Sequence, residues 1–186
     1  MPLEGALDEP DPRTVGAARS GDLGAFEDLV RRYQGHVWRL ALHLLHDPDL
    51  ASDATQEAFV RAYRFLPRYR GDSKFSTWLF SIARNCALDE ARRATRRRRI
   101  SDRAEAQPAP PTRDLGVAIE VREAVASLPL DLREPIVMID MFGISYKEVA
   151  AILGTPEGTI KSRVHRAREL LVESLSPRSG EDAGAY

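Results

Sequence analysis

The sequence has few of the features that indicate a secreted, membrane-bound or metal-binding protein. Its 186 residues include one cysteine, Cys86, which excludes an intramolecular disulfide framework and a cysteine-rich metal site. We expect Cys86 to be a small buried apolar residue. No apolar run is long enough to cross a membrane, and the acidic, proline-rich start lacks the basic flank of a signal peptide. We therefore expect a cytoplasmic protein without membrane insertion.

Signs of enzyme chemistry are also missing. No glycine-rich phosphate loop, metal-ligand cluster or nucleophile–base pair stands out, so we expect no catalytic residue and no cofactor. His36, His43 and His46 lie along one predicted helix, but their spacing without a supporting cysteine is not that of a zinc site. The net charge of −1 argues against a generic nucleic-acid coat protein. Any DNA binding must therefore depend on local sorting of charge.

Helical periodicity dominates the pattern that is present. Apolar residues recur at helical spacing, and no strand-like alternation of useful length interrupts them. The predicted helices cover 25–45, 51–66, 77–99, 117–128, 131–142, 143–154 and 155–175. Pro135 fits the fifth of these only if it lies in the first helical turn. The sequence therefore predicts an all-α fold.

Composition divides the chain into two small helical domains joined by a flexible linker. Residues 100–116 are rich in proline and carry charges of both signs, which is typical of a linker. The domains predicted on either side cover 21–99 and 117–175. The extension 1–20 and the tail 176–186 have little to bury, and we expect both to be disordered.

The second domain contains a predicted helix-turn-helix. Ser145 and Glu148 have the spacing of a capping box, and Gly154 fits a left-handed helix end. Thr155 is then expected to cap the next helix, with Pro156 at its first position. Two helices joined by so short a turn form a helix-turn-helix.

The faces of the last helix differ in chemistry. One stripe is apolar, and the opposite face carries short polar side chains and arginine, with further cations at its edges. The apolar stripe comprises Ile160, Val164, Ala167 and Leu171, the outward face Gly158, Ser162, His165, Arg166 and Glu169, and the edges Lys161, Arg163 and Arg168. This arrangement suits a DNA major groove, where arginine reads guanine and flanking cations hold phosphates. The alternative is a solvated basic helix, but the capped turn favours a defined docking geometry.

In the first domain, the helix over 77–99 has two adjacent stripes. Leu79, Ala83 and Cys86 are expected to pack into the core. Trp78 and Asn85 lie on the neighbouring stripe beside a basic run, where they could face single-stranded DNA. The alternative is that Trp78 is a core residue. The preceding loop, "RYRGDSKFS", is a further functional candidate because rigid helices position it.

The segment "DATQEAF" indicates a protein partner. Ala54, Ala58 and Phe59 can pack inward at helical spacing. The outward residues form an acidic and amide patch, which is unsuited to DNA and favours a basic protein partner, although such residues also commonly face water. They are Asp53, Gln56 and Glu57.

Taken in order, these motifs resemble a known family. The segments "DATQEAFVRAYR", "RYRGDSKFSTWLFSIARNCALDEARR" and "GISYKEVAAILGTPEGTIKSRVHRAREL", with a proline-rich linker before the last, are similar to extracytoplasmic-function (group four) sigma factors of bacterial RNA polymerase. The resemblance covers Gly21 to Leu175. It implies a sigma region 2 domain at 21–99 and a sigma region 4 domain at 117–175.

The resemblance implies a role for each segment. Asp53, Gln56 and Glu57 match the helix that binds the clamp helices of the polymerase's largest subunit, and the flap of the second largest subunit is a further expected partner. The residues implied in minus-ten DNA binding are Arg70, Gly71, Asp72, Ser73, Lys74, Phe75, Trp78, Asn85, Arg92 and Arg93. Those implied in minus-thirty-five binding are Thr155, Gly158, Thr159, Lys161, Ser162, Arg163, His165, Arg166 and Arg168.

The family also implies a monomeric free protein that is held inactive by an anti-sigma factor. One position departs from the family pattern: many relatives carry a basic residue just before the turn at Gly143, where this chain has Ile139 and Asp140. Promoter preference therefore does not transfer from relatives. The main alternative function is a free-standing helix-turn-helix regulator that binds operators as a dimer.

Overall fold

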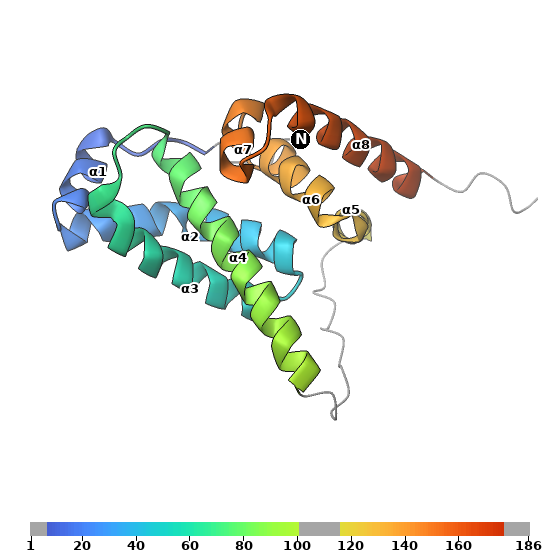
Figure 1. The fold of residues 1–186 in the computed structure, drawn as a ribbon, viewed down its shortest axis with the longest axis horizontal. Coiled ribbons are helices and arrows are strands. Elements are labelled where there is room, and N and C mark those ends of the chain that lie inside the picture. The colour runs from blue at the N-terminus through green and yellow to red at the C-terminus, as the bar shows by residue number, and fades with distance from the viewer. Residues whose placement is uncertain (1–6, 101–115, 177–186) are drawn as a thin grey trace, which may run out of the picture.

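The computed structural model describes residues 7–100 and 116–176, which are helical and contain no β-strand (Figure 1). The predicted all-α fold is therefore confirmed. The first part contains α1 (Pro12–Arg19), α2 (Leu23–Leu45), α3 (Pro48–Phe65), the short 3-10 turn η1 (Leu66–Arg68) and α4 (Phe75–Ile100). The second contains α5 (Gly116–Ser127), α6 (Leu130–Ile136), the π-helical turn η2 (Val137–Met141), α7 (Tyr146–Leu153) and α8 (Glu157–Leu175). Most of the predicted linker and tail lie outside the described residues.

Aspartate caps set the starts of the long helices in the first domain. Asp22 accepts a hydrogen bond from the Ala25 amide at 3.0 Å at the start of α2. Asp47 accepts from the amides of Asp49 and Leu50 at 2.9 and 3.0 Å at the start of α3. The two helices are therefore separated by a sharp turn.

Helix α1 corrects the expectation of disorder over 1–20, which is wrong for residues 7–20. The Arg32 guanidinium contacts the Asp8 carboxylate at 2.9 Å, and the Tyr33 hydroxyl donates to the Asp8 carbonyl at 3.0 Å. The Ser76 hydroxyl also hydrogen-bonds to Glu9. These partners lie far along the chain, so local composition did not indicate them.

The helix-turn-helix has the predicted capping box but a different start to its second helix. The Glu148 amide donates to Ser145 Oγ at 3.3 Å, and Glu148 Oε2 accepts from the Ser145 amide at 3.0 Å. Gly154 adopts the left-handed conformation with φ of 61°. Thr155 is not the cap, however: its hydroxyl turns back to the Leu153 carbonyl, and Pro156 occupies the capping position.

The expectation for Pro135 is wrong as well. It lies inside α6, five residues after Leu130, rather than in the first turn. Without an N–H, Pro135 cannot donate to the carbonyl four residues earlier. The chain then continues as the π-helical turn η2.

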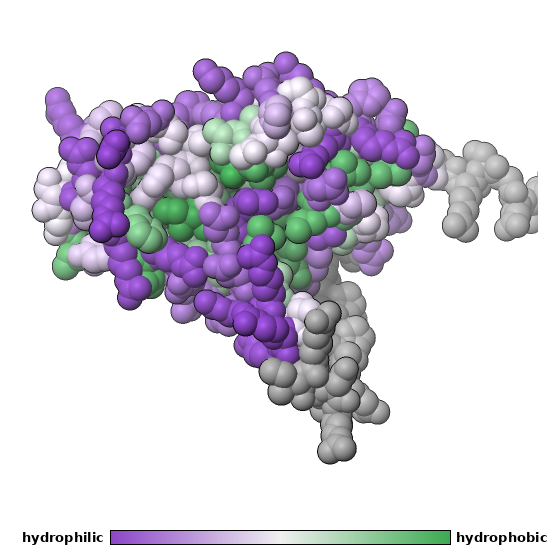
Figure 2. All heavy atoms as spheres, in the orientation of Figure 1, coloured by the Kyte–Doolittle hydropathy of each residue, from purple (hydrophilic) through white to green (hydrophobic). Residues whose placement is uncertain are grey.

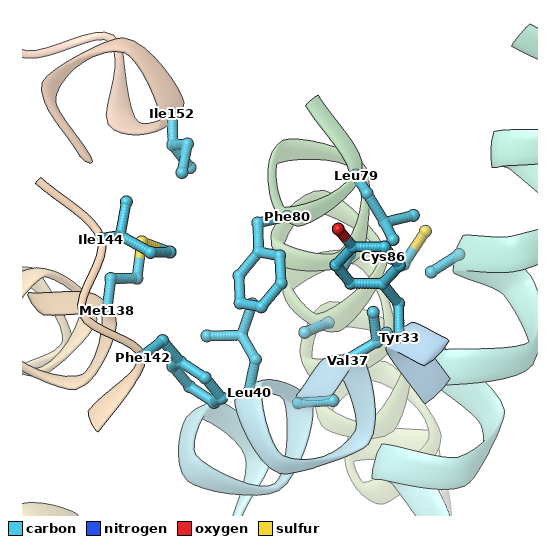
Figure 3. Close-up of a cluster of buried hydrophobic side chains, with 14 of the residues drawn as sticks. Tyr33, Val37, Leu40, Leu79, Phe80, Cys86, Met138, Phe142, Ile144 and Ile152 are labelled. Carbon is cyan, nitrogen blue, oxygen red and sulfur yellow. The ribbon is translucent and has the colours of Figure 1, made fainter. Parts of the chain in front are cut away.

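The two domains pack side by side, although the sequence predicted only a tether between them. Helices α2 and α4 of the first domain face α6, η2 and α7 of the second (Figure 1). Their apolar side chains belong to one buried cluster, in which Phe80 lies beside Phe142 (Figure 3). None of the described helices is both long and apolar enough to cross a membrane.

Candidate nucleic-acid and protein interfaces

Helix α8 separates buried and exposed residues as its sequence predicts. Ile160, Val164 and Ala167 are completely buried, so this stripe fixes the helix against the second domain. The opposite face is open to solvent and carries the exposed residues Gly158, Lys161, Ser162, His165, Arg166 and Arg168. Thr155, Thr159 and Arg163 are only half exposed. The rigid helix therefore presents a polar, largely cationic surface.

Several of these cationic side chains form weak, solvent-exposed ion pairs with acidic residues on α8 itself. Lys161 Nζ lies 2.8 Å from Glu157, and Arg166 Nη1 lies 3.1 Å from Glu169. Such exposed pairs contribute about 0–1 kcal/mol, so a phosphate or a base edge can displace them. Open space beside Gly158 also allows close approach to the start of the helix.

Arg168 is held differently, because its partner lies outside α8. Its guanidinium donates to both carboxylate oxygens of Asp140, at 2.6 and 3.1 Å. This hydrogen-bonded pairing raises the pKa of Arg168. A minus-thirty-five contact from Arg168 would therefore require loss of a fork-shaped interaction.

An aromatic cluster positions the loop before α4. Phe75 is buried and packs against Tyr33, Tyr69 and Trp78, with ring centroids 5.5, 6.0 and 5.6 Å apart. Phe75 therefore supports the loop in this structure rather than offering its ring to solvent. Arg70, Gly71, Asp72, Ser73 and Lys74, in contrast, are all exposed.

Tyr69 lies in the candidate loop "RYRGDSKFS", but the sequence reasoning did not name it as a site residue. Its hydroxyl donates to the Ser73 carbonyl at 2.6 Å and closes the loop. Its ring lies 5.1 Å from that of Trp78, which is half-buried. A concavity there is lined by Arg68, Tyr69, Arg70, Asp72, Ser73 and Trp78. The aromatic spacing Tyr69–Phe75–Trp78 was the signal available in the sequence.

The exposed side of α4 continues from this concavity toward its arginine-rich end. Asn85, Arg92 and Arg93 are all exposed to solvent. Arg92 lies 3.4 Å from Asp89, and Arg93 lies 3.3 Å from the buried Glu90. The strongly hydrophilic end of α4 projects from the molecule (Figure 2). Leu79, Ala83 and Cys86 are buried as predicted, and burial raises the pKa of Cys86 to about 11.

The outward face of α3 carries the acidic patch. Ala54 and Ala58 are buried, while Asp53 and Gln56 are exposed. Glu57 is half-buried and accepts from Arg61 at 2.7 Å. Arg61 also reaches Asp89 on α4 at 3.0 Å, and these hydrogen bonds raise the pKa of Arg61. A groove between α3 and α4 runs beside Asp53, Gln56 and Glu57.

The histidine pair at the end of α2 has cationic surroundings. Arg133 lies 2.5 Å from His46 Nε2. Burial, then the charges of His46, Arg122 and other arginines, lowers the pKa of His43 to about 4. No group of three or more His, Cys, Asp or Glu side chains within 7–100 or 116–176 is placed to hold a metal ion.

Comparison with protein families gives two matches in the same chain order. Residues 29–97 match the model of sigma-70 region 2, and residues 118–171 match that of sigma-70 region 4. The chain belongs to the sigma-70 family. Both domains seen in the structure therefore correspond to regions of a sigma factor.

Individual relatives place this sigma factor in the extracytoplasmic-function group. It is 36% identical to the RNA polymerase sigma-H factor of Pseudomonas aeruginosa, over 91% of this chain and 95% of that protein. It is 38% identical to the extracytoplasmic-function sigma-E factor of Escherichia coli, over 90% of this chain and 95% of that protein. Its activity is therefore promoter-specific initiation of transcription with RNA polymerase.

Solved structures of similar chains agree with this assignment. The sigma factor RpoE of Bartonella quintana, in complex with the anti-sigma factor NepR, matches with a TM-score of 0.71 and 30% identity, over 84% of this chain and 99% of that chain. CnrH, in complex with the cytosolic domain of CnrY, also matches with a TM-score of 0.71, at 28% identity, over 91% of this chain and 99% of that chain.

Proposed function

We propose that this sigma factor binds core RNA polymerase through α3 and grips promoters at two separate sites. The observation that carries the proposal is the presence, on one chain, of two different exposed surfaces whose chemistry suits nucleic acid. One is the polar, cationic face of α8, and the other is the aromatic concavity between η1 and α4. A third surface is the acidic and amide face of α3, which borders the groove between α3 and α4.

At the minus-thirty-five element, α8 enters the major groove. Ser162, His165 and Arg166 are central on the exposed face and read base edges. Lys161 and Arg163 lie at its borders, where they meet phosphates. Arg168, at the same border, joins them only when it leaves Asp140. Thr155, Gly158 and Thr159 line the start of the helix, which approaches the duplex most closely.

At the minus-ten element, the loop 70–75 and α4 capture the opened strand. A base leaving the stack enters the concavity lined by Tyr69, Asp72 and Trp78, where ring stacking offsets the cost of unstacking. Asn85 supplies an amide for hydrogen bonding, and Arg92 and Arg93 follow the backbone. The chain thus stabilises melted DNA without catalysing a reaction.

The acidic face of α3 meets the polymerase. Asp53 and Gln56 are exposed, and Glu57 is held in place by Arg61, so the three form a preorganised acidic and amide surface. The complementary partner is the clamp-helix segment of the largest subunit, while the flap of the second largest subunit meets the region 4 domain. A cytoplasmic anti-sigma factor that covers these faces regulates the free monomer.

The polymerase contact is tested by comparing Asp53→Lys with Asp28→Lys. Both variants reverse one exposed acidic charge, but Asp28 lies on α2, outside the proposed contact. In size-exclusion chromatography with core polymerase, Asp53→Lys should fail to co-elute, while Asp28→Lys should co-elute as the unaltered chain does. Co-elution of both variants at equal strength would refute the role of α3.

A further inference from the structure

The groove between α3 and α4 has walls of opposite charge. Its volume is about 700 Å³, and the two helices that form it lie side by side (Figure 1). The α3 wall carries carboxylates, whereas the α4 wall carries mainly guanidinium groups. The charged lining residues are Asp53 and Glu57 on α3, and Glu90, Arg93, Arg96 and Arg97 on α4. The arginine-rich end of α4 therefore faces acidic residues of α3 across the groove.

Glu90 holds two of these arginines at the α4 wall. Its side chain is 7% exposed, and it pairs with Arg93 at 3.3 Å and accepts a hydrogen bond from Arg97. A buried carboxylate requires a charged partner, so both guanidinium groups are drawn to this wall. The Arg97 side chain nevertheless remains 62% exposed, and Arg96 is exposed as well. Arginine has more N–H donors than one carboxylate accepts, so Arg97 can bind a second acidic group.

A further contact fixes the spacing of the two walls. Arg61 of α3 donates to Glu57 at 2.7 Å and to Asp89 of α4 at 3.0 Å. This bridge ties the two helices together and holds the Glu57 carboxylate in one geometry. The groove is therefore already formed in the free chain, which lowers the entropic cost of binding a partner.

The charge pattern suits a protein segment better than it suits nucleic acid. A DNA backbone is uniformly anionic, so the carboxylates of the α3 wall would repel the phosphates that the arginines of the α4 wall attract. A polypeptide segment with basic side chains on one side and acidic side chains on the other complements both walls at once. Val60, which lines the groove and is 44% exposed, adds an apolar contact for such a segment.

We propose that Arg96 and Arg97 belong to the polymerase-binding surface and not to the minus-ten DNA surface. They contact acidic side chains of the same clamp-helix segment whose basic side chains contact α3, so the inference rests on the proposed function. The polymerase-binding surface then has two walls, one on each helix.

The basic end of α4 is divided lengthwise between two partners. Arg92 precedes Arg97 by five residues, which places the two side chains about 140° apart around the helix. Arg92 pairs with Asp89 at 3.4 Å, outside the groove, and keeps its role at the DNA backbone. Arg93 lines the groove one helical turn closer to the loop 70–75 and borders both surfaces.

Equilibrium binding of the full chain to core polymerase, without DNA, tests this assignment. The combined variant Arg96→Ala/Arg97→Ala should raise the Kd roughly tenfold, because two interface cations are lost. The matched control is Arg13→Ala/Arg31→Ala, which removes the same charge from exposed positions on α1 and α2. The control should bind as the unaltered chain does. An equal Kd for the two combined variants would overturn the assignment. Circular dichroism establishes that each variant is folded.

The salt dependence of DNA binding tests the competing assignment of these arginines to DNA. Polymerase saturated with each variant is titrated with a promoter duplex that the unaltered chain transcribes. Arg96→Ala/Arg97→Ala should keep the slope of log affinity against log salt, whereas Arg92→Ala should reduce that slope by about one. A slope reduced by about two in the combined variant, with unchanged polymerase affinity, would place both arginines on phosphates and refute the inference.

Asp53→Lys separates this contact from the proposed function. If Asp53→Lys fails to co-elute with polymerase while Arg96→Ala/Arg97→Ala binds as the control does, only the assignment of α4 is wrong. If Asp53→Lys co-elutes as well, the polymerase contact through α3 is wrong too.

Discussion

Asp140 and Arg168 form a two-pronged ion pair between the turn η2 and helix α8, with distances of 2.6 and 3.1 Å. The resemblance to the family implied a basic residue in this part of the chain, where this chain has Ile139 and Asp140. Asp140 replaces that basic residue with an acidic one, and it also neutralises the charge of Arg168 by pairing with it. The family pattern therefore overestimates the positive charge that this face offers to DNA.

Asp140→Asn should release Arg168 and strengthen binding to duplex DNA of any sequence. One additional phosphate contact steepens the dependence of log affinity on log salt by about one. Fluorescence anisotropy of the full chain on a duplex, repeated across salt concentrations, measures this slope. The control is Arg168→Ala, which should have little effect alone but should cancel the gain in the Asp140→Asn background. A slope unchanged by Asp140→Asn would show that Arg168 does not reach DNA.

Arg166→Ala should relax specificity at one base pair of the minus-thirty-five element. Loss of a base-edge contact costs about 1–3 kcal/mol of discrimination at that position. Holoenzyme transcription from promoters varied one base pair at a time provides the measurement. Lys161→Ala, at the edge of the same face, should instead weaken all promoters alike. Uniform weakening by Arg166→Ala would make Arg166 a phosphate contact.

Trp78→Leu should impair strand opening while preserving the polymerase contact. The leucine retains apolar volume but lacks the ring face, and base stacking on an aromatic side chain contributes roughly 1–3 kcal/mol. Permanganate reactivity of unpaired thymines in the holoenzyme complex should fall accordingly. Trp38→Phe is the control, since Trp38 lies on α2 and bonds Ser52 at 3.3 Å. Normal opening with Trp78→Leu would place Trp78 among purely structural residues.

Stability should decline as the pH falls from about 6.5 toward 4. The pKa of His43 is about 4 in the folded chain, whereas an unperturbed histidine has a pKa of about 6.5. The unfolded chain therefore binds a proton that the folded chain excludes within this window. The contribution of His43 is fully present above the window and is lost at about 1.4 kcal/mol per pH unit at most.

Urea unfolding between pH 7.5 and 5.5 checks the contribution of His43. His43→Gln should flatten the decline, and His165→Gln, an exposed site on α8, should not. The prediction fails if both variants follow the pH dependence of the unaltered protein.

Much of the fold was accessible from local sequence signals. The periodicity around Val37 and Val164 gave the buried faces of α2 and α8, and the pair Ser145–Glu148 gave the start of α7. These signals depend on residues a few positions apart. The start of α8 was predicted one residue early, because the Thr155 hydroxyl bonds back to the Leu153 carbonyl instead of capping the helix.

Features that depend on distant residues were not accessible. The segment before α1 is held through Asp8 and Glu9 by Arg32, Tyr33 and Ser76, and its own sequence is acidic and contains little to bury. The packing of the two domains against each other could not be predicted for a similar reason. The sequence around Phe80 and Phe142 predicts only that each is a core residue of its own domain. No local pattern indicates that Arg84 pairs with Glu134, 50 positions further along the chain.

In the candidate sites too, features that depend on nearby residues could be predicted from the sequence, and features that depend on distant residues could not. Charge and periodicity indicated the exposed faces of α3 and α8, since exposure follows from the helical repeat. The environment of Phe75 and the partner of Arg168 depend on tertiary packing, and only the structure located them.

In vitro transcription with purified core polymerase tests the central claim most directly. Adding this chain to core polymerase on genomic templates should produce discrete transcripts from a small set of promoters, and these should be absent with core polymerase alone. If no promoter-specific transcript appears on any template, or if the same transcripts arise without the chain, the account is contradicted.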